Sequence, residues 1–247
     1  MACIRNFKLT LEYDGTNYHG WQVQAGLPTI QGALEEKLQT LTREAIRVIA
    51  AGRTDAGVHA LGQVINFKSS TPIPSNRLAK ALNSLPPYDI IVKGVEEISL
   101  DFHARRDAKA KTYRYSLFCS THPPALGARY TLHVPISLDI NAMEKATSFL
   151  IGRHDFSAFR SIHCGARSPW RTIYQAYFAP EREYIYFYIT ADAFLQHMAR
   201  RIIGTLLQVG KGKVSPEGFR DVLESKERSR AGPTAPPHGL CLMEVHY

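Results

Sequence analysis

Three side chains able to do chemistry lie close together in the block AGRTDAGVHA, residues 51–60: Arg53, Asp55 and His59. An ionised carboxylate held in a rigid loop can act as a nucleophile or as a general base. Arg53 and Asp55 are two positions apart, so in an extended segment both project to one side, where a guanidinium favours an ionised carboxylate. The block also has the composition of an ordinary turn, because Asp bonds to its own backbone and Gly adopts positive φ. The block alone is compatible with a reactive carboxylate and with a polar turn between two strands.

Two arginines are the next candidates, in the predicted helix that includes FLQHMARRIIGTLLQV. At about 100° per residue its apolar side chains fill a wide arc, and His197, Arg200, Arg201 and Gly204 occupy the remaining wedge. Arg200 lies at the edge of this wedge, where a partly buried guanidinium needs a carboxylate or a phosphate. The competing interpretation is a surface arginine whose charged end reaches solvent.

Two predicted strands, 111–118 and 183–190, carry tyrosines at alternate positions, so that the rings of each strand share a face. Aromatic rings beside Lys and Arg suit stacking on unpaired bases. The alternative is that tyrosines are good strand residues that pack sideways. The tyrosines are Tyr113 and Tyr115 in the first strand, flanked by Lys111 and Arg114, and Tyr184, Tyr186 and Tyr188 in the second.

The composition narrows the class of protein. A chain of 247 residues with 45% hydrophobic residues can bury a substantial core as one large or two modest domains. The net charge of +8 favours an acidic partner, of which nucleic acid is the commonest. Four cysteines without a CxxC pair argue against a zinc ribbon or a disulfide scaffold. The first residues contain no long apolar run, so we expect a cytoplasmic protein without a membrane span.

The elements that must position these residues follow the order β-α-β-β-α-β in each half of the chain. Each half is therefore expected to be a ferredoxin-like α+β unit with an antiparallel sheet and helices on one face. The predicted units are residues 1–105 and 106–247. The expected strands are 6–13, 46–51, 63–68, 89–98, 111–118, 171–178, 183–190 and 239–247, and the expected helices are 29–41, 74–85, 139–151, 191–209 and 215–225.

Seven blocks of the sequence together resemble the tRNA pseudouridine synthase A family, in the order of that family and across nearly the whole chain. Agreement at one block arises easily by chance, whereas agreement at seven in order does not. The blocks are LEYDGTNYHGWQ, GRTDAGVHA, FHARRDAKAKTYRY, DFSAFR, SPWRTI, FLQHMARRIIGTLL and the GL before the last strand.

The resemblance implies an isomerase that converts uridine to pseudouridine in the anticodon stem-loop of tRNA. It implies that Asp55 is the catalytic aspartate and that Tyr113 contacts the target base and assists proton movement at its C5 atom. Arg200 would pair with the aspartate, while Arg53 would help extrude the uridine or bind its backbone. Other substrate-binding residues implied by the matching blocks are His59, Phe159, Arg160 and Leu240.

The resemblance further implies the pseudouridine synthase fold, with an active-site cleft between two ferredoxin-like units. It implies a homodimer that binds tRNA and works without a cofactor or a metal. One departure from the family is Arg201, where a smaller polar residue such as Asn is expected. This departure leaves open which of the two arginines pairs with Asp55.

Pseudouridine formation requires uracil to leave its ribose, rotate and reattach through carbon. Carboxylate attack on the sugar, attack on the base, or removal of a ribose proton could each begin the reaction, and the sequence does not choose among them. All three need the nucleotide flipped out, at a cost of a few kcal/mol. Two alternatives are a non-catalytic RNA-binding protein or chaperone, in which Asp55 is a turn residue, and a metal-dependent nuclease. A nuclease would need several clustered carboxylates, which the basic loop does not supply.

Overall fold

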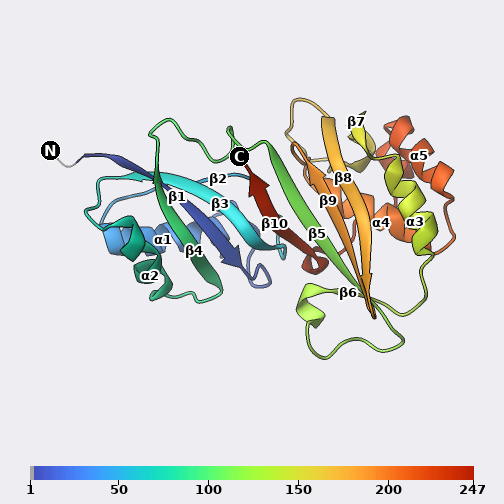
Figure 1. The fold of residues 1–247 in the computed structure, drawn as a ribbon, viewed down its shortest axis with the longest axis horizontal. Helices are drawn as coiled ribbons and strands as arrows, with labels where there is room; N and C mark the ends of the chain where they lie inside the picture. The colour runs from blue at the N-terminus through green and yellow to red at the C-terminus, as the bar shows by residue number, and fades with distance from the viewer. Residues whose placement is uncertain (1–2) are drawn as a thin grey trace. The chain divides into compact units, whose positions relative to one another are not determined.

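The computed structural model describes residues 3–247, which form two compact units (Figure 1). Unit 1 runs to Lys109 and also includes Leu242–Tyr247, and unit 2 comprises Ala110–Cys241. The chain was predicted to divide at residues 105 and 106, with the final strand assigned to its second half. The structure places the last six residues with unit 1.

Unit 1 is an antiparallel sheet with two helices. In its sheet β1 lies between β3 and β4, and the short β2 pairs with β3. The part of β10 that belongs to unit 1 lies beside β3. The elements are β1 (Arg5–Tyr13), α1 (Ile30–Thr42), β2 (Ile49–Ala50), β3 (His59–Ser69), α2 (Ser75–Asn83), β4 (Ile90–Ile98) and β10 (Leu240–His246).

The core of unit 1 follows from alternation in β1 and from helical spacing in α1 and α2. Side chains at alternate positions of β1 point to one face of the sheet, and those on that face are apolar. Thr29 is the N-cap of α1, one residue after which the helix begins, and its hydroxyl accepts a hydrogen bond from the Gly32 N–H at 3.3 Å. Fully buried members of this core are Phe7, Leu9, Leu11, Leu34, Leu38, Leu78 and Leu82.

Unit 2 has a sheet in the order β5-β9-β8-β7, in which neighbouring strands are antiparallel. β6 pairs with β5 in parallel, and neither β6 nor β7 was expected from the sequence. The elements are β5 (Ala110–Cys119), β6 (Leu132–Val134), α3 (Ile140–Ser148), β7 (Gly152–Asp155), β8 (Trp170–Glu181), β9 (Tyr184–Ala191), α4 (Met198–Gly210) and α5 (Pro216–Ser225). Short 3₁₀ turns span Ala128–Tyr130, Ser157–Phe159, Arg228–Arg230 and Pro237–Gly239.

Two predicted boundaries were wrong. The long helix begins at Met198 rather than at residue 191, because His197 adopts a left-handed backbone with φ of 65° that cannot continue a helix. The strand predicted over 46–51 contains only Ile49 and Ala50. The structure is a mixed α+β fold with a mostly antiparallel arrangement of strands, and none of its described helices is long and apolar enough to cross a membrane.

Candidate active site

The Asp55 loop lies in unit 1, between β2 and β3, and its backbone is held in a tight turn. The N–H of Val58 donates to the Asp55 carbonyl at 3.1 Å, which closes the turn. Gly57 has φ of 75°, a conformation that glycine adopts without steric cost. The Gly57 N–H donates to the carbonyl of Tyr18 at 3.3 Å, so that a second loop holds the turn from outside.

That second loop, residues 14–21, is the framework of the Asp55 loop. The Trp21 N–H donates to the Thr54 carbonyl at 3.0 Å, and the Thr54 hydroxyl lies 2.9 Å from the Tyr13 hydroxyl. A Cβ atom at Gly20 would lie 2.9 Å from the Thr54 carbonyl oxygen, too close for any larger residue without a shift. These contacts join two blocks of the family resemblance, because the segment LEYDGTNYHGWQ holds the segment GRTDAGVHA in place.

Sequence reasoning assigned no role to this framework. The sequence signal that could have found it is the pair of glycines in DGTNYHGW. A Cβ atom at Gly15 would lie 2.1 Å from the carbonyl oxygen of Val58, so the two loops approach backbone to backbone. Glycine is the residue that permits such an approach.

His59 is the first residue of β3, and its ring is buried. Its Nδ1 atom lies 3.1 Å from the Gly15 N–H nitrogen and 3.1 Å from Asp14 Oδ1. The ring therefore joins the Asp55 loop to the 14–21 loop, a position suited to support of the turn.

Arg53 and Asp55 differ in their surroundings. The Arg53 side chain is exposed, and among residues 3–247 its guanidinium makes no hydrogen bond or ion pair. Asp55 is half-buried. The loop thus presents an exposed guanidinium two positions from a carboxyl group whose backbone is fixed, which is compatible with substrate binding at the first and chemistry at the second.

Tyr113 lies on β5 of unit 2, directly opposite Ile189 of β9, and is 6% exposed. The ring of Phe194 packs edge-on against it, with ring centroids 4.9 Å apart. Tyr115 is buried on the same face and donates its hydroxyl to the Pro236 carbonyl at 2.8 Å. The two tyrosines share a face as predicted, but that face is the buried one, and Tyr115 cannot serve as a stacking platform.

Arg200 is half-buried in the first turn of α4. Its Nε donates to the carbonyl of Ala235 at 2.8 Å, and the Ala235 N–H donates back to the Arg200 carbonyl at 3.1 Å. Burial lowers the pKa of the nearby His238, and the charge of Arg200 lowers it further. The segment that precedes β10 therefore contacts Arg200 twice: the Ala235 carbonyl accepts from the side-chain Nε, and the Ala235 N–H donates to the backbone carbonyl.

Arg201 points to a different neighbour. It is 8% exposed, and its Nη2 donates to the carbonyl of Arg228 at 2.7 Å. Burial lowers the pKa of Arg201, and the nearby charge of Arg228 adds to the effect. Within the predicted wedge, Arg201 is thus covered by the segment containing Arg228, and Gly204 is covered by Pro233.

The remaining predicted residues are Phe159, Arg160 and Leu240. Phe159 is fully buried, and its ring stacks on Phe219 with centroids 5.7 Å apart. Arg160 is half-buried, and its guanidinium has no hydrogen bond or ion pair among the described residues. Leu240 begins β10 and is buried. Phe159 is placed as a core residue of unit 2, next to α5.

An aromatic surface, defined as Tyr177, Tyr184, Tyr186, Tyr188 and Arg114, lies on the other face of the same sheet. On β9 the apolar residues are buried and the tyrosines are half-buried, which confirms the predicted alternation. Tyr177 stacks on Tyr188 with centroids 5.2 Å apart, Tyr184 stacks on Tyr186, and the Arg114 guanidinium lies 5.0 Å from the Tyr186 ring. Stacked rings with an arginine resemble surfaces that bind unpaired bases.

Within the described residues, 3–247, no group of three or more His, Cys, Asp or Glu side chains is placed to hold a metal ion.

An α+β chain with a fixed aspartate loop and a basic, aromatic surface has the features of an RNA-modifying enzyme. A model of the family described as tRNA pseudouridine synthase matches residues 10–107 and 146–247. The chain is 47% identical to the tRNA pseudouridine synthase A of Acetivibrio thermocellus over 244 residues, which cover 99% of this chain and all of that protein. It is equally similar to the corresponding protein of Caldicellulosiruptor bescii, and 46% identical to that of Moorella thermoacetica over the full length of both.

The chain belongs to the tRNA pseudouridine synthase family. Enzymes of this family are isomerases that convert uridine to pseudouridine in tRNA. The family resemblance predicted from the seven sequence blocks is confirmed.

Proposed function

We propose that this protein isomerises uridine to pseudouridine in the anticodon stem-loop of tRNA, with Asp55 as the catalytic carboxylate. The observation that carries the assignment is the fixed backbone around Asp55. The turn is closed by the Val58 N–H, bounded by Gly57 and supported at Thr54 by Trp21. A carboxyl group on such a backbone is held in position before the substrate arrives, and catalysis gains from pre-organisation of this kind.

The chemistry requires an ionised carboxylate close to the flipped uridine. Asp55 then attacks the sugar or the base, or removes a ribose proton, and the released uracil rotates before it is joined to the ribose through C5. We propose that Tyr113 contacts the uracil ring and assists transfer of the proton from C5. We further propose that Arg53 acts on the uridine or its backbone while it leaves the helix, because its guanidinium is exposed beside Asp55.

Arg200 is the proposed partner of the Asp55 carboxylate, in preference to Arg201. Arg201 is almost fully buried, and its guanidinium donates to the Arg228 carbonyl. Arg200 keeps a partly exposed side chain whose direction is set by Ala235. His59, Phe159, Arg160 and Leu240 also stay in the proposal as residues that form or support the substrate site.

The finer description of the fold belongs to the same proposal. The order β1-α1-β2-β3-α2-β4 of unit 1, and the alternation of strands and helices in unit 2, support two ferredoxin-like units. A homodimer in the cytoplasm is what the family resemblance implies. Light scattering of the purified protein on a sizing column gives its mass directly, and a monomer that forms pseudouridine at the full rate would remove the dimer from the proposal.

The decisive experiment is nucleoside analysis of an unmodified tRNA transcript after incubation with the purified protein, without added metal. We expect wild type to form pseudouridine in the anticodon stem-loop. Asp55→Ala should lower the rate by at least about 10³-fold, since it removes the group on which the chemistry depends. Its affinity for tRNA should stay within about threefold, because phosphate contacts supply most of the binding energy.

Asp221→Ala is the matched control, because Asp221 is an exposed carboxylate on α5 whose contact with Arg220 is 3.9 Å long. It should leave the rate unchanged. Pseudouridine formation retained in Asp55→Ala would contradict the assignment of Asp55 as the catalytic carboxylate. A wild-type protein that binds tRNA and forms no pseudouridine would instead indicate an RNA-binding protein or chaperone.

A further inference from the structure

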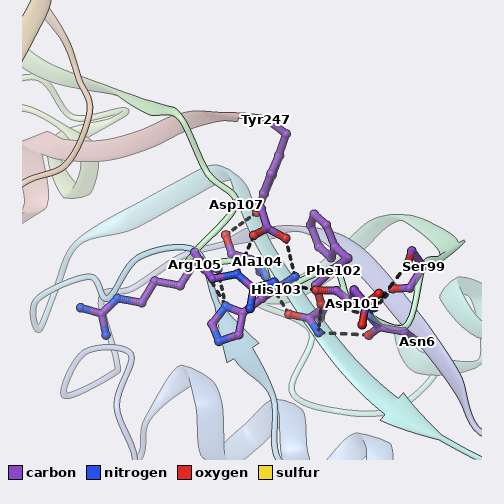
Figure 2. Close-up of polar contacts among 11 residues, drawn as sticks. Asn6, Ser99, Asp101, Phe102, His103, Ala104, Arg105, Asp107 and Tyr247 are labelled. Atoms are coloured by element: carbon purple, nitrogen blue, oxygen red, sulfur yellow. Dashed lines mark hydrogen bonds and ion pairs between the residues drawn. The ribbon is translucent and has the colours of Figure 1, made fainter.

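The loop that follows β4, residues 99–107, has no role in the function proposed above, yet several side chains hold its backbone (Figure 2). Two fully buried asparagines lie beneath it. Asn6 donates its amide to the carbonyls of Ser99 at 2.8 Å and Phe102 at 3.0 Å. Asn66 donates to Asn6 Oδ1 at 3.0 Å and accepts from the Ala104 N–H at 2.9 Å. Burying an amide group costs folding free energy unless the group is hydrogen-bonded. The hydrogen bonds of these two asparagines therefore hold the loop backbone in this conformation.

The outer side of the loop is fixed as well. The His103 N–H donates to Asp107 Oδ2 at 2.8 Å, and the His103 Nδ1 accepts from the N–H groups of Arg105 at 3.3 Å and Arg106 at 3.2 Å. The hydrogen bond from the His103 backbone lowers the pKa of Asp107, and the Arg106 side chain lowers it further. The Tyr247 hydroxyl donates to the Ala104 carbonyl at 2.8 Å.

The two neighbouring arginines of this loop have different roles. The Arg106 guanidinium is bonded within the loop, to Asp107 Oδ1 at 2.9 Å and to the Asp101 carbonyl at 2.7 Å. The Arg105 side chain is exposed and extends away from the network (Figure 2). Among the described residues its guanidinium makes no hydrogen bond or ion pair. The network therefore fixes the backbone of a residue whose own charged group is not used by the fold.

We propose that Arg105 binds a phosphate of the tRNA backbone. A guanidinium forms paired hydrogen bonds with phosphate oxygens, and little ordering entropy is lost when its backbone is already fixed. Contacts of this kind hold RNA in register without reading its sequence. The inference rests on the proposed function, because it takes tRNA as the ligand, and it adds to that function a positioning contact in the FHARRD segment.

The test compares Arg105→Ala with Arg77→Ala by measuring the tRNA dissociation constant between about 50 and 200 mM salt. Arg77 is the matched control, because it is exposed on α2 and its guanidinium likewise makes no hydrogen bond or ion pair among the described residues. Both variants lose one positive charge. We expect Arg105→Ala to weaken binding about five- to tenfold and to reduce the salt slope by about one, relative to Arg77→Ala. Its kcat at saturating tRNA should equal that of wild type, while its KM rises.

Equal binding by the two variants would overturn the proposal. Thermal melting gives a second check, since Arg106→Ala should lower the melting temperature and Arg105→Ala should not. A decrease in Arg105→Ala as large as that in Arg106→Ala would show a structural role and would also overturn it. Binding is measured without turnover, so a protein that forms no pseudouridine can still show the Arg105 effect. Failure of the proposed function is therefore distinguishable from failure of this inference.

Discussion

At the scale of single residues, arginines that are adjacent in the sequence make different contacts. Arg105 and Arg106 are one such pair, and Arg200 and Arg201 are another. In α4 the two arginines are about 100° apart around the helix, so each meets a different part of the segment that precedes β10. Arg200 bonds to the Ala235 carbonyl, whereas Arg201 bonds to the Arg228 carbonyl. One residue type thus serves two structural environments, which spacing alone does not distinguish.

This difference predicts opposite results from substitution of the two arginines. Arg200→Ala should lower the rate of pseudouridine formation by about 10² to 10³-fold, the loss typical of a group that stabilises charge in a reaction. Arg201→Met should keep the rate within a few-fold of wild type, because a buried ion can often be replaced by an apolar side chain of similar volume. Single-turnover kinetics on saturating tRNA transcript measures both. A severe loss in Arg201→Met with a normal Arg200→Ala would reverse the assignment.

At the scale of elements, α4 packs closely against the segment 232–235, with a glycine on each side, Gly204 and Gly232. A Cβ atom at Gly204 would lie 1.8 Å from the carbonyl oxygen of Pro233. Thr205 strengthens the same contact, because its hydroxyl accepts from the Gly232 N–H at 2.9 Å. Ala235, which bonds to Arg200, follows directly in this segment. The close approach at Gly204 therefore determines where the Arg200 guanidinium is held.

Gly204→Ala is expected to destabilise the protein by about 2 to 3 kcal/mol, because backbone must move to make room for the methyl group. It should also lower activity, since a displaced segment no longer orients Arg200. Urea denaturation and the nucleoside assay measure the two effects. Gly218→Ala in α5 is the control, because its Cβ would meet only side-chain atoms, the nearest at 3.0 Å. If both variants unfolded at the same urea concentration, the close approach would not be a constraint.

Most elements were predictable from sequence because alternation and helical spacing report burial directly. The strands β1, β5 and β9 and the capped helix α1 are examples. The start of α4 was predicted wrongly because the residue that ends the helical conformation there is a histidine with a left-handed backbone, and not a proline or glycine that the sequence would reveal. Alternation predicted which face of β5 Tyr113 shares with Tyr115. It did not predict that this face is buried, since alternation does not show which side of the sheet the helices cover. The Asp55 loop was predicted to be a site only from its resemblance to the family blocks, because its turn chemistry is ordinary.

At the scale of the whole molecule, the chain passes between its two units twice, after Lys109 and after Cys241. The second passage returns Leu242–Tyr247 to unit 1. There the Lys109 N–H donates to the His246 carbonyl at 2.8 Å, and Tyr247 packs on Phe102 with ring centroids 5.1 Å apart. Unit 1, which carries Asp55, is therefore assembled from two separate stretches of sequence.

Deletion of residues 242–247 should accordingly destabilise unit 1, the unit to which these residues belong. It removes a strand from beside β3 and the hydrogen bonds at Lys109 and Ala104. Hydrogen exchange followed by mass spectrometry should show loss of protection in residues 3–109. Tyr247→Phe serves as a mild control, since it removes one hydrogen bond worth about 1 kcal/mol. Loss of protection confined to unit 2 would contradict this account.

The return of β10 to unit 1 also determines when the strands of unit 1 become available for pairing during synthesis on the ribosome. Residues 242–247 are translated after the whole of unit 2, so β3 leaves the exit tunnel long before this neighbour exists. During that interval the part of this side of β3 that β2 does not cover is an open strand edge, which in other proteins invites pairing with foreign chains. The nascent enzyme therefore completes the unit that carries its proposed catalytic aspartate last, although that unit is the first to be translated.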